Sequence, residues 1–172
     1  ILLLLGNGGA ARALAFEAAQ RCPALRLTIA CRESSQEKAN ALAREVADYL
    51  RERGGRGFRL VVETYAELEA ECMGPDAPSF DLLLNATSVG MYPRVGVSPV
   101  SGEVVSQCAA VFDAVYNPGK TELLSLAEQA GVKAVGGMEM LVYQAVAAHE
   151  LWFGTTFRPE DLRDLCRDAQ KE

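Results

Sequence analysis

The chain has 172 residues, of which 49% are hydrophobic and 23% are charged, and its formal net charge is −6. These values are typical of a globular domain, and the negative charge argues against a nucleic-acid or anionic-membrane partner. No apolar run reaches the length of a membrane span, and the five cysteines lack the spacing of a zinc site or a disulfide framework, so we expect a cytoplasmic protein with reduced thiols and no metal site.

Apolar strand-like runs alternate with segments of helical periodicity along the chain. We predict strands at 1–5, 25–31, 58–64, 80–85, 110–115 and 132–135. We predict helices at 9–21, 36–53, 65–73, 103–108, 121–130 and 138–153, and a last helix that begins near Pro159. This alternation predicts an α/β fold, a doubly wound parallel sheet of the Rossmann-like, NAD(P)-binding kind.

The segment GNGGAA at 6–11 lies between the first predicted strand and the first predicted helix. It fits the pattern G-x-G-x-x-G/A, with Gly6, Gly8 and Ala11 at the three small positions. In that pattern the first glycine allows a sharp turn, the second lets the backbone approach a pyrophosphate, and the third small residue lets the helix pack on the sheet. The free N–H groups of the helix N-terminus then face the phosphates. We predict dinucleotide binding; the alternative is a tight turn without a ligand.

The end of the second predicted strand bears on which dinucleotide binds. An acidic residue at this place binds the ribose hydroxyls of NAD, whereas an arginine accommodates the 2′-phosphate of NADP. Here Arg32 is followed at once by Glu33, so the signal is mixed. Because Arg32 comes directly after the strand, we expect NADP, with NAD as the alternative. A solvated loop pair is the interpretation that involves no ligand.

Three later stretches extend the interpretation beyond a general dinucleotide fold. They are NATSVGM at 85–91, FDAVYNPGKTELL at 112–124 and GGMEMLVYQAVAAHELWFG at 136–154. Together with GNGGAAR at 6–12, and in this order and spacing, they resemble the C-terminal half of shikimate dehydrogenase across nearly the whole chain.

The resemblance implies a set of cofactor-binding residues. They are Gly6, Asn7, Gly8, Gly9, Ala10, Cys31, Arg32, Lys38, Thr87, Ser88, Met91, Ala114 and Gly137. By resemblance, the glycine segment holds the pyrophosphate, Arg32 meets the 2′-phosphate, and Ala114 and Gly137 border the nicotinamide. The family usually has Asn-Arg-Thr where this chain has Cys31-Arg32-Glu33. For Lys38, a solvated helix position is as consistent with the sequence as a phosphate contact.

The resemblance also implies that Tyr116 and Gln144 bind the substrate. The family's acid–base lysine and its aspartate partner belong to an N-terminal substrate domain, and no lysine of this chain lies in a matching motif, so we expect no catalytic residue here. Because Ile1 already lies inside a strand-like run, we expect the sequence to be an excerpt from a longer chain. We treat residues 1–172 as one dinucleotide-binding domain whose last helices, at about 138–171, pack toward that substrate domain.

The function implied by the resemblance is the reversible, NADP-linked reduction of 3-dehydroshikimate to shikimate, a step of aromatic amino-acid biosynthesis. Two alternatives stay open: an NAD-preferring quinate/shikimate dehydrogenase, which Glu33 favours, and a non-catalytic module that senses dinucleotides. A glutamyl-tRNA reductase would explain the glycine segment but not the stretches around Tyr116 and Gln144. His149 is the only histidine, and we expect it to pack rather than to catalyse.

Overall fold

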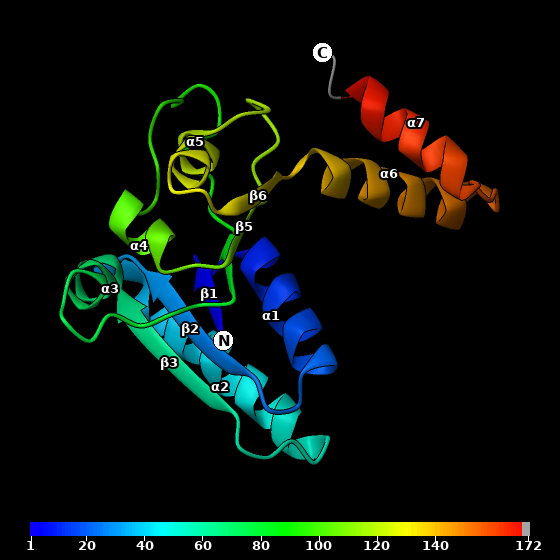
Figure 1. Cartoon of the computed structure of the whole chain (residues 1–172). Coiled ribbons are helices and arrows are strands. Elements are labelled where there is room, and N and C mark those ends of the chain that lie inside the picture. The colour runs from blue at the N-terminus through cyan, green and yellow to red at the C-terminus, as the bar shows by residue number, and fades with distance from the viewer. Residues whose placement is uncertain (170–172) are drawn as a thin grey trace.

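Six parallel strands form the centre of the computed structural model, which describes residues 1–169 (Figure 1). The strands are β1 (Leu2–Leu5), β2 (Arg26–Cys31), β3 (Arg59–Thr64), β4 (Leu82–Asn85), β5 (Ala110–Asp113) and β6 (Lys133–Gly136). Their order in the sheet is β3-β2-β1-β4-β5-β6, and every neighbouring pair is parallel. The chain therefore winds outward from β1 in one direction and then from β4 in the other, which confirms the predicted doubly wound sheet.

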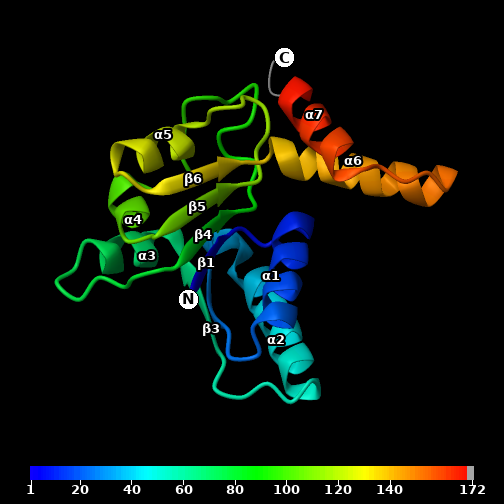
Figure 2. The ribbon, with the colours of Figure 1, turned by 45° about the vertical axis from the view of Figure 1, so that its right-hand side comes forward.

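Helices cover both faces of this sheet. They are α1 (Gly9–Arg21), η1 (a 3-10 turn, Glu33–Ser35), α2 (Gln36–Glu52), α3 (Tyr65–Cys72), α4 (Gly102–Ser106), α5 (Glu122–Gln129), α6 (Met138–Phe153) and α7 (Pro159–Ala169). In Figure 2, α1 and α2 lie on one side of the sheet, and α3, α4 and α5 lie on the other. Two separate hydrophobic cores result from this arrangement.

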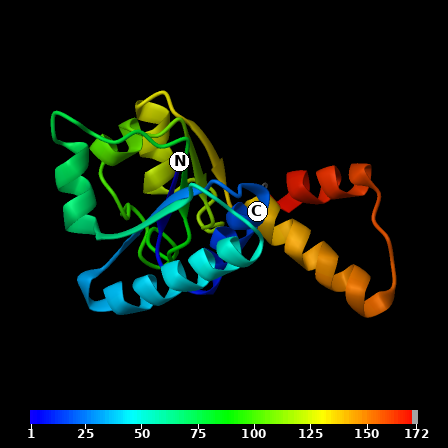
Figure 3. The same ribbon diagram turned by 90° about the horizontal axis from the view of Figure 1, so that it is seen from below.

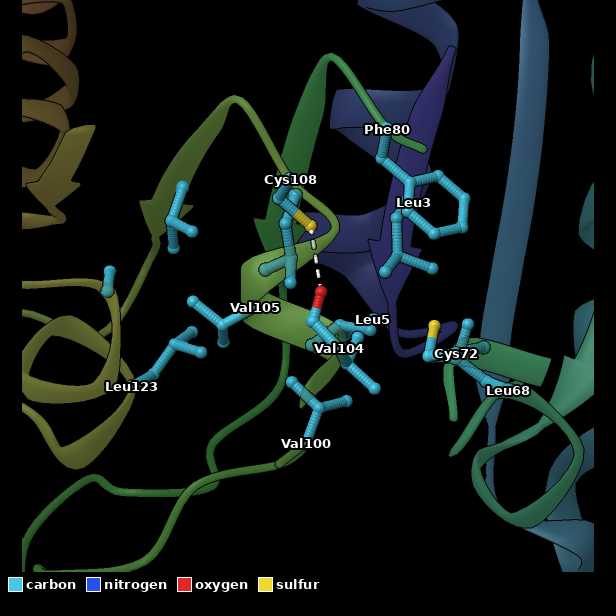
Figure 4. Close-up of a cluster of buried hydrophobic side chains, with 14 residues drawn as sticks. Leu3, Leu5, Leu68, Cys72, Phe80, Val100, Val104, Val105, Cys108 and Leu123 are labelled. Atoms are coloured by element: carbon cyan, nitrogen blue, oxygen red, sulfur yellow. Dashed lines mark hydrogen bonds between the residues drawn. The ribbon is translucent and has the colours of Figure 1, made fainter. Parts of the chain in front are cut away.

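Successive side chains of β1 point to opposite faces of the sheet, so β1 contributes residues to both cores. Leu4 belongs to the core under α1 and α2, where the small residues Ala11, Ala15 and Ala19 repeat every fourth position and let α1 lie close to the strands. Leu3 and Leu5 belong to the opposite core, together with side chains of α3, α4 and α5 (Figure 4). A strand buried on both faces is continuously apolar, as the run at 2–5 is.

The last two helices leave the sheet. After β6, α6 extends away from the strands, and α7 folds back along it, so the pair forms an arm on one side of the molecule (Figures 1 and 3). Gly154 ends α6 in the left-handed conformation, with φ 64°. The predicted end of the last helix near residue 171, and Lys171 with it, lies outside the described residues. Within residues 1–169, no helix is both long and apolar enough to cross a membrane.

Strand β5 ends two residues earlier than the sequence predicts, at Asp113 rather than at 115. The Asp113 carboxylate accepts a hydrogen bond of 3.0 Å from the backbone N–H of Val115. This bond bends the chain out of the strand, because the N–H of Val115 turns back to the side chain that precedes it. Residues 114 and 115 consequently lie in the loop at the carboxyl end of the sheet.

Candidate functional site

The turn between β1 and α1 is shaped by its glycines. Gly6 has φ +99°, and a Cβ at this position would lie 2.9 Å from the Thr87 side chain. Gly8 precedes the first residue of α1 and provides no side-chain cap, and a Cβ built on it meets no atom within 4 Å. The first turn of α1 contains no acidic residue. The N–H groups of this turn thus face open space at the positive end of the helix, which suits an anion.

A cavity of about 380 Å³ lies over this turn. Seven of the predicted cofactor residues line it: Gly6, Asn7, Gly8, Cys31, Arg32, Thr87 and Ser88. Seven residues that are not among the predicted ones also line it: Ser35, Tyr65, Ala86, Val89, Gly90, Arg94 and Val97. The two charged side chains of this lining are both guanidinium groups, and no carboxylate of the described residues is among them. In a chain with a net charge of −6, this is a local concentration of positive charge.

Asn7 joins the glycine turn to the loop that carries Arg32. Its side-chain amide donates a hydrogen bond of 2.8 Å to the backbone carbonyl of Ser35, and the Ser35 hydroxyl donates one of 3.0 Å to the carbonyl of Arg32. Glu33, the residue that made the sequence signal mixed, lies exposed in η1 and does not line the cavity. Among the ion pairs found within residues 1–169, none involves Arg32.

Cys31 and Tyr65 form the less polar part of this lining. Burial raises the pKa of the Cys31 thiol above its ordinary value, although a hydrogen bond with Ser35 opposes the shift. Burial likewise raises the pKa of Tyr65 to about 12. Both side chains are therefore neutral at neutral pH, and Cys31 has no tendency toward the reactive thiolate form. Within the described residues, no cluster of histidine, cysteine or acidic side chains could hold a metal ion.

A buried polar network lies beneath the ends of β4 and β5. Asn85 donates a hydrogen bond of 2.8 Å to Asp113, and Thr121 donates one of 2.6 Å to the other carboxylate oxygen. The Asn85 carbonyl oxygen accepts bonds from the backbone N–H and the hydroxyl of Thr87, at 3.0 and 2.7 Å. Burial raises the pKa of Asp113, and its three hydrogen bonds oppose that shift.

Asp113 and Thr121 are not among the site residues predicted from the sequence. A signal was available, because LLLN and AVFD are apolar runs that each end in a polar residue on a neighbouring strand. Polar side chains at the carboxyl ends of adjacent parallel strands meet at one edge of the sheet. The network holds Thr87, and through it the cavity floor, in a fixed place.

A second cavity, of about 780 Å³, lies between the loop after β5 and the start of α6. Tyr116, the predicted substrate-binding tyrosine, lines it and is 39% exposed. Gln144 is exposed on α6 but lines neither this cavity nor the one over the glycine turn. It lies seven positions after Gly137, which places it roughly 10 Å along a helix that points away from the sheet. The two predicted substrate residues are thus not brought together by residues 1–169.

Gly137 is required by the packing of the protein itself. A Cβ at this position would lie 2.3 Å from the backbone oxygen of Ala114, which no atom tolerates. The N–H of Gly137 donates a hydrogen bond of 3.1 Å to the carbonyl of Val115. Glycine here lets the start of α6 lie directly against the end of β5. The predicted neighbours Ala114 and Gly137 are therefore side by side, although neither lines the cavity over the glycine turn.

The other predicted positions lie outside that cavity. Lys38 is exposed in the first turn of α2, and Met91 is exposed in the loop after β4. Gly9 and Ala10 open α1 and are exposed. Cofactor contacts by these four residues, and by the other predicted residues, stay predictions. His149 packs between the rings of Phe153 and Phe157, with centroids 4.6 and 5.4 Å away, and hydrogen-bonds Thr155.

Comparisons with known proteins show which proteins this chain resembles. A family model described as the shikimate 5′-dehydrogenase C-terminal domain matches residues 137–164. The chain is 36% identical to the shikimate dehydrogenase (NADP(+)) of Methanocaldococcus jannaschii over 168 residues, covering 97% of this chain and 54% of that protein.

Two solved structures resemble the fold. Shikimate 5-dehydrogenase from Thermus thermophilus, in complex with NADP(H) and shikimate, has a TM-score of 0.70 and 32% identity, covering 98% of this chain and 54% of that one. Quinate dehydrogenase from Corynebacterium glutamicum, in complex with NAD, has a TM-score of 0.73 and 25% identity, covering 97% and 54%.

The chain spans about half the length of the curated relatives it matches. The similarity nevertheless runs through almost all of its own residues, from the glycine turn to the helical arm. The resemblance inferred from the four sequence stretches is therefore confirmed. Over the half of its relatives' length that it covers, the chain is similar to the shikimate dehydrogenases.

Proposed function

We propose that this chain binds NADP over the glycine turn and is the dinucleotide-binding half of an enzyme that reversibly reduces 3-dehydroshikimate to shikimate. One observation carries the cofactor assignment. The cavity over the turn is lined by Arg32 and Arg94 and by no carboxylate of the described residues, and it opens on the positive end of α1. A ligand with several phosphate groups is the partner that this charge distribution favours.

Each part of a dinucleotide has a matching group on this chain. The N–H groups of Gly8, Gly9 and Ala10 receive the pyrophosphate, because Gly8 has no Cβ to keep the phosphate oxygens away. Arg32 receives the 2′-phosphate, since its forked guanidinium pairs well with phosphate oxygens. Asn7 and Ser35 hold the Arg32 backbone at a fixed place beside the turn. Cys31 contributes only an uncharged side chain to the lining of the cavity.

The nicotinamide end is assigned to the loops after β4 and β5. Thr87, Ser88 and Met91 follow β4, and Ala114 and Gly137 meet at the end of β5. When bound, the nicotinamide supplies or accepts the hydride. The residues of this chain bind and orient the ring, and the described residues hold no acid–base group at a place the family motif assigns to one. We assign the proton-transfer group to the substrate-binding half of the relatives' length.

The helical arm is the surface we assign to contact with that substrate-binding half. Leu151, Trp152 and Phe153, at the end of α6, are 82%, 74% and 68% exposed. Three consecutive large apolar side chains in water are unusual for a free surface and typical of an interface. Gln144 lies on the same helix, so docking along the arm would bring it toward a substrate held in the same cleft as Tyr116.

An NAD-preferring quinate/shikimate dehydrogenase is the second candidate. Glu33 favours it, because an acidic residue after β2 binds ribose hydroxyls in NAD enzymes. The position of Glu33 outside the lining of the cavity argues for NADP instead. The two candidates differ in whether the 2′-phosphate strengthens binding.

The proposal is tested by measuring binding and turnover separately. The chain alone should bind NADP(H) in a fluorescence titration but should reduce no NADP in the presence of shikimate. Joined to the remaining half of the Methanocaldococcus jannaschii relative, it should oxidise shikimate, and Tyr116→Phe and Gln144→Ala should each raise the KM for shikimate. Robust shikimate oxidation by the chain alone, or unchanged kinetics in both variants, would contradict the assignment of roles.

A further inference from the structure

We propose that Arg94 is a second cofactor-binding residue, whose guanidinium pairs with the pyrophosphate. This inference rests on the proposed function and extends it. Arg94 lies in the loop after β4, in none of the positions that the family resemblance implied, and it lines the same cavity as Arg32 and the glycine turn.

The strand order places the two arginines on opposite sides of the phosphate-binding turn. Arg32 follows β2, the glycine turn follows β1, and Arg94 comes from the loop after β4, and these strands are adjacent in the order β2-β1-β4. In a doubly wound sheet, the adenosine half of a dinucleotide lies on the β2 side of the turn, and the nicotinamide half lies on the β4 side. The pyrophosphate joins the two halves over the turn. A guanidinium that reaches this cavity from the β4 side therefore meets the pyrophosphate rather than the 2′-phosphate.

Arg94 is not occupied by an ion pair within the described residues, so its guanidinium can bind an anion. Several other arginines of the chain are matched to carboxylates, among them Arg12 with Glu45 and Arg158 with Asp161. Arg94 takes part in none of the ion pairs or side-chain hydrogen bonds found within residues 1–169. A guanidinium in such a cavity attracts anions, because no carboxylate of the described residues lines it.

The loop that carries Arg94 is anchored on both sides of it. Before Arg94, the N–H of Tyr92 donates a hydrogen bond of 3.0 Å to the carbonyl of Asn117. Gly90 is buried, and a Cβ on it would lie 3.0 Å from the carbonyl oxygen of Val97, so the loop closes on itself around residues 91–96. These contacts place the backbone of Arg94 beside the turn, which lowers the entropy lost when its guanidinium binds a ligand.

The two arginines are distinguished by the ligand they respond to. NADP and NAD share the pyrophosphate and differ in the 2′-phosphate. If Arg94 pairs with the pyrophosphate, its removal weakens both dinucleotides by a similar factor. If Arg32 pairs with the 2′-phosphate, its removal weakens NADP alone.

Isothermal titration calorimetry of the chain with NADP and with NAD tests this assignment. Arg94→Ala should weaken both ligands by about tenfold, the effect of losing one charge-assisted hydrogen bond, and Arg94→Lys, which keeps the charge but not the fork, should lose less. Arg56→Ala removes an exposed arginine from the loop before β3 and should bind like the wild type.

Circular dichroism melting confirms that each variant is folded, and Arg94→Gln serves as a polar replacement if alanine unfolds the loop. The inference is overturned if the folded Arg94 variants bind both ligands like the wild type, or if they lose affinity for NADP alone. A wild-type chain that binds neither dinucleotide would instead overturn the proposed function itself.

Discussion

The side-chain amide of Asn85 donates a 2.8 Å hydrogen bond to the carboxylate of Asp113, and both side chains are completely buried. Each residue ends a strand, so this bond ties the carboxyl ends of β4 and β5 together. Burying a carboxylate is costly unless hydrogen bonds compensate it, and Asp113 also receives bonds from Val115 and Thr121. The loops that carry Thr87 and Tyr116 both start from this network.

Thr121 is the part of the network that a substitution tests most cleanly. Its hydroxyl donates to Asp113 and accepts the N–H of Leu124 at the start of α5, at 2.6 and 3.3 Å. Thr121→Val removes both bonds and should lower the free energy of unfolding by about 2–4 kcal/mol. Thr121→Ser keeps the hydroxyl and should recover most of that loss. Urea unfolding of the wild type and the two variants measures these differences. Equal stability of Thr121→Val and Thr121→Ser would show that the hydroxyl contributes nothing to stability.

Gly137 is predicted to tolerate no side chain at all. A Cβ there would lie 2.3 Å from the oxygen of Ala114, so Gly137→Ala must push the start of α6 away from β5. We expect a loss of about 3 kcal/mol or more in thermal or urea unfolding. Gly119→Ala is the matched control, because a Cβ on Gly119 meets nothing within 4 Å. Two variants of equal stability would contradict the close approach.

Gly8 is predicted to matter for binding and not for folding. Its Cβ position is open in the protein, so Gly8→Val should cost at most about 1 kcal/mol of stability, as a poor helix cap does. The added side chain would occupy the place assigned to the pyrophosphate, and the affinity for NADP should fall by at least about tenfold. Ala13→Val, exposed further along α1, should leave affinity unchanged. A Gly8→Val chain that binds NADP normally would place the pyrophosphate elsewhere.

Glu63 is predicted to make stability depend on pH. One of its carboxylate oxygens is buried and has no hydrogen-bond partner among residues 1–169. Burial, together with repulsion from Glu71 and Glu67, raises its pKa above the ordinary 4.5. The folded state therefore holds the proton to higher pH than the unfolded chain, so the stability contributed by this group falls as pH rises through the raised pKa.

Glu63→Gln removes this titration. The variant should be more stable than the wild type at pH 7, and the difference should shrink as pH is lowered toward 4.5. Unfolding free energies measured across that range, with the exposed Glu52→Gln as control, test the effect. A gain that stays constant with pH would mean that the charge of Glu63 is not its cause.

Much of the fold follows from local patterns in the sequence. The apolar run before Gly6 predicts a buried strand, and Ala11 at the third small position predicts a helix packed close to the sheet; both are present. The sequence pattern places the end of β5 two residues late, because AVFDAV is apolar throughout except for Asp113. The side chain that ends the strand does so by a hydrogen bond to its own backbone, and an apolar pattern does not reveal such a bond.

The candidate site could be predicted only where its residues lie in contiguous motifs. Gly6, Gly8 and Arg32 follow directly from the strand–turn–helix pattern and line one cavity. Arg94 enters the same cavity from a loop whose path depends on contacts far away in the sequence, such as the one between Tyr92 and Asn117. Gln144 is the opposite example, because a contiguous motif predicts it but it does not line the cavity at Tyr116. Its helix, α6, extends away from the sheet.

We propose that Arg32 selects NADP through the 2′-phosphate. The most direct measurement is the equilibrium affinity of the wild-type chain and of Arg32→Ala for NADP and for NAD. The wild type should bind NADP at least about tenfold more tightly than NAD, and Arg32→Ala should lose that preference while its affinity for NAD stays unchanged. Equal binding of the two dinucleotides by the wild type, or an unchanged preference in Arg32→Ala, would contradict the account.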